Sequence, residues 1–206
     1  MDAVALAVAW AGPVIVAGAW AAIRLGGVSI WAAMGWTAGP LGLLSLLTGW
    51  VEPGGGLVVV PIGLGAGLVL YAATLVFLHL VRGWTLLTRH TREVYSWRRG
   101  MSLGAVVAIA CLVVAPGEEA LWRGLVQGRL AAALGEGAAA AAGWALYVVA
   151  NLASGSVPIV LGAAVGGAVW AALAFWTGGI LAGVACHVVW TGLMILRPPV
   201  EEGPPG

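Results

Sequence analysis

Seven apolar stretches, each close to the length of a membrane-crossing helix, follow one another through this sequence and limit what it can fold into. A helix needs about 20 residues to cross the hydrocarbon core of a bilayer. By that measure we predict helices at residues 4–23, 28–50, 57–81, 101–121, 137–153, 158–176 and 179–196. Most connections between them contain Gly, Pro or Ser, which favour turns. The predicted fold class is an all-α, polytopic helical membrane bundle of about seven transmembrane helices.

The composition agrees, since only 8% of the 206 residues are charged and 62% are hydrophobic. Soluble globular domains are usually about one quarter charged. The sequence also holds 33 Gly and 12 Trp, which are frequent in membrane helices and at headgroup depth respectively. We interpret pairs of small residues four apart, such as Gly63 and Gly67, as helix packing contacts. Membrane lipids are therefore expected partners, and a net charge of +1 predicts no nucleic-acid partner.

The longest polar connection, residues 82–100, mixes five arginines with Trp, Leu, Val and Tyr. This mixture predicts an interfacial amphipathic segment. The positive-inside rule places the segment in the cytoplasm. Seven crossings then put Arg24 and Arg197 on the same side, and Asp2 and Glu52 on the opposite side.

The few ionisable residues inside the apolar stretches are informative, because a charge within a bilayer is costly. The densest group is Pro116-Gly117-Glu118-Glu119, followed by Arg123. We expect Pro116 to kink or interrupt the fourth helix just before the acids. Glu119 and Arg123 are four residues apart, so they share a helical face and can form an ion pair. Glu118 points about 100° away, where no nearby cation in the sequence is placed to neutralise it, and it is available as a general base.

Each of these polar residues also has an ordinary structural interpretation. Both glutamates can lie at the membrane surface, with Arg123 pairing at headgroup level. His187, well within the last stretch, can be a hydrogen-bonded core residue. Asn151, near the end of the fifth stretch, can cap its helix because Ser154 and Gly155 follow at once.

Taken together, these residues resemble the motifs of the CAAX protease and bacteriocin-processing family. Its members are glutamic intramembrane proteases that include the Ras-converting enzymes. The family's first motif is Glu-Glu-x-x-x-Arg, which is present here as Glu118, Glu119 and Arg123, followed by the usual Gly124.

The second and third motifs of that family are present in altered form. The second, Phe-x-x-x-His, reads Tyr147-Val-Val-Ala-Asn151 here, so that Asn stands in place of His. The third, His-x-x-x-Asn or Asp, reads His187-Val-Val-Trp-Thr191, with Thr in place of Asn. An amide such as that of Asn151 can position a water but cannot exchange a proton near neutral pH.

The resemblance implies a role for each of the other motif residues. Glu118 would be the base that activates water, and His187 would donate a hydrogen bond to the developing oxyanion. Glu119 and Arg123 would brace the site. Thr191 still offers a hydroxyl donor to the oxyanion.

The resemblance covers about half of the chain and suggests how the chain is divided. We predict N-terminal transmembrane helices and the basic loop at residues 1–100, a family-like catalytic core at 101–196, and a disordered tail at 197–206. The tail is too rich in Pro and Gly to pack. All three parts form one integrated membrane domain.

Two hypotheses for the function follow. The first is an intramembrane glutamic-type endopeptidase that hydrolyses a peptide bond of a membrane-anchored or lipidated peptide or protein. The second is a catalytically impaired family member that acts as a membrane binding scaffold or as an accessory subunit of a larger membrane complex. The absence of Lys and the Ala, Gly and Arg bias suggest a high-GC bacterial genome, and thus a multi-pass protein of the cytoplasmic (inner) membrane.

Other classes of function are less well supported by the residues. We expect no cofactor and no metal, because Glu118 and His187 with an amide make a poor ligand set for zinc. A proton or ion pathway would use intramembrane Glu and His side chains, but the chain has too few of them for a relay.

Overall fold

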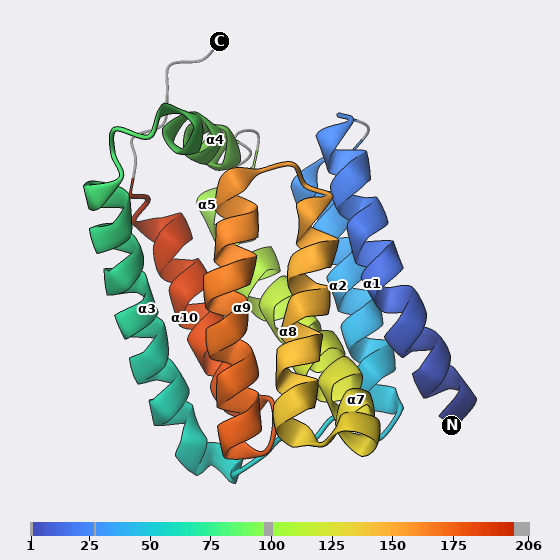
Figure 1. The fold of residues 1–206 in the computed structure, drawn as a ribbon. Helices are drawn as coiled ribbons and strands as arrows, with labels where there is room; N and C mark the ends of the chain where they lie inside the picture. The colour runs from blue at the N-terminus through green and yellow to red at the C-terminus, as the bar shows by residue number, and fades with distance from the viewer. Residues whose placement is uncertain (1, 27, 97–100, 200–206) are drawn as a thin grey trace.

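The computed structural model describes residues 2–26, 28–96 and 101–199, and these residues form helices and no strands. The helices are α1 (Asp2–Arg24), α2 (Ile30–Leu47), α3 (Val60–Leu80), α4 (Thr85–Ser96), α5 (Leu103–Ala108), α6 (Ala115–Glu119), α7 (Gln127–Leu134), α8 (Glu136–Leu152), α9 (Val157–Thr177) and α10 (Leu181–Leu196). A short 3₁₀ turn, Gly56–Val59, leads into α3. The predicted all-α class is confirmed (Figure 1).

Each of the seven predicted helices has a counterpart in this bundle. Five helical segments of the described chain are long and apolar enough to cross a membrane: Ala3–Arg24, Ile30–Leu47, Gly56–Leu80, Leu103–Leu134 and Val157–Thr177. The other two, α8 and α10, have 17 and 16 residues. In Figure 1, α10 lies between α3 and α9, and α8 lies beside α9. The chain is a polytopic helical membrane protein.

The fourth helix is longer than predicted. It was expected at residues 101–121, but it continues from Leu103 to Leu134, through α5, α6 and α7, over 32 residues. Pro116 does not interrupt it. The turns on either side of α6 are π-helical. Such wider turns tolerate the backbone hydrogen bond that a proline removes, and they leave room for its ring. Glu118 and Glu119 therefore lie at the middle of a helix that crosses the bundle diagonally behind α8 and α9 (Figure 1).

Glycines bring the central helices unusually close together. On α3, a Cβ added to Gly63 would collide with the carbonyl oxygen of Ala182, and one added to Gly67 would lie 2.8 Å from that of Cys186. The backbones of α3 and α10 are thus in direct contact, and the interpretation of Gly63 and Gly67 as packing residues is confirmed. A Cβ on Gly117, just before the acidic pair, would collide with the carbonyl oxygen of Ala38 on α2.

Helix α4 lies across one end of the bundle, the upper end in Figure 1. The backbone N–H of Val157, at the start of α9, donates to Nδ1 of His90 on α4 at 3.2 Å. The Arg24 side chain lies against Gly155 in the turn before α9, and Arg197 follows the end of α10 at this end of the bundle. Arg24, α4 and Arg197 therefore share one side, as predicted, while residues 97–100 and 200–206 lie outside the described part.

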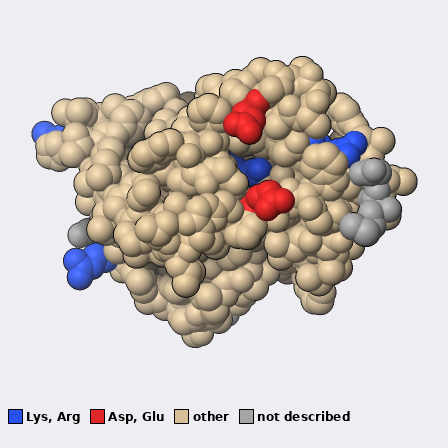
Figure 2. Space-filling model, turned by 90° about the horizontal axis from the view of Figure 1, so that it is seen from below, with Lys and Arg blue, Asp and Glu red and all other residues tan. Residues whose placement is uncertain are grey.

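The opposite end of the bundle holds the start of α1 and the loop between α2 and α3 (Figure 1). There the carbonyl oxygen of Glu52 accepts the backbone N–H of Ile180, which joins this loop to the turn before α10. Figure 2 shows that the surface of this end is mostly uncharged, with a few charged side chains exposed. The placement of Glu52 opposite the basic segment agrees with the prediction, whereas the side of the cell that each end faces stays a prediction.

Candidate active site

A buried polar network centres on Glu119, whose side chain is 0% exposed. Its Oε1 accepts a hydrogen bond from Arg123 Nη1 at 3.4 Å and lies 2.9 Å from His187 Nδ1. The first contact was predicted from the four-residue spacing, and the second was not. Gly183, one turn before His187 on α10, permits the approach, because a Cβ there would lie 2.9 Å from Glu119 Oε2.

The burial of this network bears on the two interpretations of the acidic pair. Glu118 and Glu119 are covered by protein, since the first is 6% exposed and the second 0%. Their burial favours an internal pair over an ordinary pair exposed at headgroup level. The reason is that the fourth helix does not end at Leu121 but continues for more than three further turns beyond it.

Arg123 is held from several directions. Besides Glu119, its Nη2 donates to the carbonyl oxygen of Gly167 on α9 at 3.1 Å. Its guanidinium carbon lies 4.5 Å from the centre of the Tyr147 ring and 5.4 Å from that of Trp170. A cation over aromatic rings is stabilised by their quadrupoles, so the charge has partners despite its burial. Gly167 is required here, because a Cβ on it would lie 3.3 Å from Arg123 Nη2.

Glu118 points away from this network, as the helical period predicts. Its Oε2 accepts the hydroxyl hydrogen of Tyr147 at 2.9 Å. Among the described residues, its Oε1 accepts no hydrogen bond. Glu118 also lines a cavity of about 530 Å³, so this second oxygen is the one available to a water or a substrate.

That cavity brings together four of the residues predicted from the motifs. Glu118, Asn151, His187 and Thr191 all line it, while Glu119 and Arg123 lie behind Glu118 and His187. Apolar side chains from α2, α3, α9 and α10 form most of the remaining wall. The cavity extends to the buried face of α4, which the structure places toward the basic end of the bundle.

Asn151 does not cap its helix, which corrects one interpretation of this residue. It is 2% exposed, and its Nδ2 donates to the carbonyl oxygen of Tyr147, one turn earlier, at 2.8 Å. The capping bond comes instead from Ser154, whose Oγ donates to the carbonyl oxygen of Asn151. The side-chain Oδ1 of Asn151 is thus the group that remains to accept a hydrogen bond in the cavity.

Two further contacts at this site were not predicted. The ring of Trp170 on α9 stacks on His187, with ring centres 3.6 Å apart and planes 15° apart. No pattern in the sequence distinguishes Trp170 from the other tryptophans. Tyr147 was noted only for its aromatic ring, although its hydroxyl, which phenylalanine lacks, was a signal that it has a polar partner.

The side chains of this site can exchange protons and donate hydrogen bonds. His187 Nδ1 faces Glu119, so Nε2 is the ring atom that can act in the cavity, as a donor when the ring carries both protons. Thr191 lies one turn further along α10 and adds a hydroxyl. In residues 2–26, 28–96 and 101–199, no three His, Cys, Asp or Glu side chains are grouped so that they could hold a metal ion.

Comparison with known proteins identifies the part of the chain that carries this site. Residues 100–193 match the family model described as Type II CAAX prenyl endopeptidase Rce1-like. No curated protein and no solved structure gave a significant match. The matched segment contains every motif residue that lines or braces the cavity. The predicted resemblance to the CAAX protease family is confirmed, and with it a relationship to membrane peptidases.

Proposed function

We propose, from the match of residues 100–193 to the Rce1-like CAAX endopeptidase model, that this chain is an intramembrane glutamic peptidase in which Glu118 activates water. One observation carries the proposal: a buried carboxylate is held on one oxygen by Tyr147, and its other oxygen is available in a cavity shared with His187. A general base must lie within hydrogen-bond reach of the water that it deprotonates. Glu118 meets this requirement for a water in the cavity.

The reaction then proceeds in two proton transfers. Glu118 accepts a proton from water as the water oxygen attacks the carbonyl carbon of the peptide bond. The carbonyl oxygen becomes an oxyanion, to which His187 Nε2 and the Thr191 hydroxyl donate hydrogen bonds. Glu118 returns the proton to the leaving amine when the C–N bond breaks. Asn151 Oδ1 accepts the other hydrogen of the attacking water and so orients it.

The second network supports these groups without touching the substrate. Glu119 holds His187 by Nδ1, which directs Nε2 toward the cavity. Arg123 holds Glu119, and Trp170 fixes the plane of the imidazole. A site in which each reacting group is restrained by a neighbour is already arranged for the transition state, which is a large part of enzymatic rate enhancement.

The cavity also suggests the class of substrate. Its wall is mostly apolar and it extends toward α4 at the basic end of the bundle. A peptide bond close to a lipid anchor or a membrane segment suits such a cavity, since the anchor stays in the apolar part. We therefore propose a membrane-anchored or lipidated peptide or protein as the substrate, in the cytoplasmic membrane of a bacterium.

The chain acts in this proposal as one integrated membrane domain. Residues 101–196 supply the reacting groups, and residues 1–100 complete the cavity with side chains such as Leu70 and Leu87. The proposal assigns no reacting group to residues 197–206.

Cleavage by the purified protein tests this function. A membrane-anchored peptide library is incubated with the reconstituted wild type and with Glu118→Gln, and the products are identified by mass spectrometry. We expect Glu118→Gln to lower cleavage by about a hundredfold or more, because it removes the base. Glu136→Gln, an exposed carboxylate at the start of α8, is the matched control and should cleave as the wild type does. Equal cleavage by Glu118→Gln and the wild type would contradict the proposal.

A second candidate function is a binding scaffold or an accessory subunit of a membrane complex, which the amide at Asn151 favours. This candidate predicts that the wild type and Glu118→Gln both bind the peptide and that neither cleaves it. Asn151→His separates the two candidates further. Cleavage that rises in this variant above that of the wild type identifies a weakened enzyme, because an imidazole can exchange protons and an amide cannot.

A further inference from the structure

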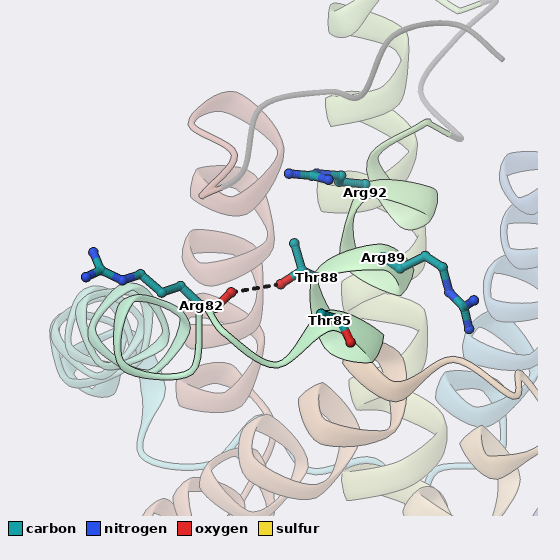
Figure 3. A pocket seen from close by; sticks show the side chains of 5 residues that line it. All are labelled: Arg82, Thr85, Thr88, Arg89 and Arg92. Atoms are coloured by element: carbon teal, nitrogen blue, oxygen red, sulfur yellow. Dashed lines mark hydrogen bonds between the residues drawn. The ribbon is translucent and has the colours of Figure 1, made fainter.

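The corner between α3 and α4 carries a cluster of arginines that the proposed reaction does not use. A recess of about 260 Å³ is lined by Arg82, Thr85, Thr88, Arg89 and Arg92 (Figure 3). The three arginines are exposed, and none forms an ion pair with an acidic side chain within the described parts of the chain. Each guanidinium therefore offers donors that match phosphate or carboxylate oxygens supplied from outside the protein.

The position of this corner relative to the bilayer follows from the helices that form it. The membrane-crossing segment Gly56–Leu80 ends just before Arg82, and Leu80 is 75% exposed. Trp84 and Leu86 are also exposed, at 45% and 39%. Exposed Trp and Leu beside arginines are typical of the boundary between acyl chains and headgroups. We therefore expect the arginines at the depth of the lipid phosphates.

The directions of the three side chains indicate what kind of anion they suit. In Figure 3, Arg82 and Arg92 extend to one side of the corner and Arg89 extends to the other, with the two threonines between them. Thr88 is already engaged, since its hydroxyl donates to the carbonyl oxygens of Trp84 and Arg82 at 3.1 and 3.5 Å. Guanidinium groups that point to different sides suit several phosphates better than one small ion.

We propose that this corner binds the phosphate headgroups of anionic phospholipids. The proposal goes beyond the peptidase function, because it concerns the lipid around the protein and not the substrate. Its structural consequence lies on the other face of α4. There Leu87, Thr91 and Tyr95 are buried and line the cavity that holds Glu118. Headgroups bound to the outer arginines hold α4 in place over that cavity.

Lipid retention tests the proposal without any need for cleavage. The full chain, as Glu118→Gln, is reconstituted in equal parts of phosphatidylcholine and phosphatidylglycerol and extracted in mild detergent. Native mass spectrometry then measures which lipids remain bound. We expect phosphatidylglycerol to be enriched several-fold over phosphatidylcholine. Arg82→Gln, Arg89→Gln and Arg92→Gln together should abolish this enrichment, because each basic residue near an anionic surface contributes about fivefold to binding.

Two control variants separate the effect from general changes in charge or folding. Arg129→Gln removes a cation that stacks on Trp50, 4.4 Å from its ring centre and outside the α4 corner, and should leave the enrichment unchanged. If the triple variant fails to fold, Arg92→Gln alone should lower the enrichment in part, below that measured with all three arginines present. Equal enrichment with and without the arginine substitutions, both in the Glu118→Gln background, would overturn the proposal. Complete displacement of the lipid by millimolar inorganic phosphate would also overturn it, since it would identify a site for the free ion.

Discussion

At the scale of single residues, the pairing of Tyr147 with Glu118 distinguishes this site from the family motif that it resembles. The motif has Phe and His where this chain has Tyr147 and Asn151, and both departures lie on one turn of α8. Asn151 donates to the carbonyl oxygen of Tyr147, so the two positions are physically linked. The tyrosine hydroxyl then supplies a polar contact to Glu118 that a phenylalanine could not make. The chain has thus lost a proton-exchanging group and gained a donor at the same site.

Tyr147→Phe tests the importance of this hydroxyl. The substitution removes one oxygen and keeps the ring under the Arg123 guanidinium. A hydrogen bond to a charged group contributes about 1.5–3 kcal/mol, so we expect kcat to fall roughly tenfold to a hundredfold. KM should stay unchanged, because the hydroxyl acts on Glu118 and not on the substrate. Steady-state kinetics on the reconstituted protein measure both constants, and an unchanged kcat would show that the hydroxyl does not position the base.

At the scale of elements, the long helix from Leu103 to Leu134 determines where the chemistry lies. Its central segment can lie against α2 only because both backbones approach without side chains at Gly42 and Gly117, where an added Cβ on either would collide with the other helix. This contact fixes the position and rotation of the two turns that carry Glu118 and Glu119. With the helix in this orientation, Glu118 points into the cavity and Glu119 points toward His187.

Gly117→Ala tests this close packing. An added methyl group would meet the carbonyl oxygen of Ala38, and overpacking of this kind usually lowers stability by about 1–3 kcal/mol. We expect a lower Tm in thermal unfolding of the detergent-solubilised protein. Gly104→Ala is the matched control on the same helix, since a Cβ there meets nothing within 4 Å. It should leave Tm unchanged or raise it slightly, because Ala favours helix over Gly. A Tm loss of equal size in both variants would mean that the contact with α2 is not the cause.

The elements also show what the sequence can and cannot predict. The helices were found because the bilayer requires a fixed length of apolar residues, and the pair between Glu119 and Arg123 was found because it is local. The extent of the fourth helix was missed, because its polar turns are satisfied by distant helices: Arg123 by Gly167 and Glu119 by His187. Trp170 was missed for the same reason, since its contact with His187 exists only after α9 and α10 pack together.

At the scale of the whole molecule, the basic residues and one side of the cavity lie toward the same end of the bundle. The basic segment, the ends of α1 and α10, and the side of the cavity that reaches α4 all lie toward one end of the bundle (Figure 1). The positive-inside rule predicts that this end faces the cytoplasm. The proposed reaction therefore takes place within the membrane, with access from the cytoplasmic side.

Cysteine labelling in intact cells tests this orientation. Cys111 and Cys186 are buried, so they should react slowly with a membrane-impermeant maleimide. We expect a cysteine at Arg92, on the outer face of α4, to be labelled only after the cells are opened. A cysteine at Glu136, at the other end of the bundle, should be labelled from outside in intact cells. The reverse pattern would contradict the predicted orientation and place the basic end outside.

The central claim is that Glu118 activates a water that attacks the substrate directly, and oxygen isotope transfer tests it most directly. A single turnover is carried out in water enriched in oxygen-18, with enzyme in excess over a membrane-anchored peptide. If Glu118 is the base, the new carboxyl terminus of the product carries one heavy oxygen and the protein carries none. If the heavy oxygen appears instead on the Glu118 side chain, the carboxylate has attacked the substrate itself, and the role assigned to Glu118 is wrong.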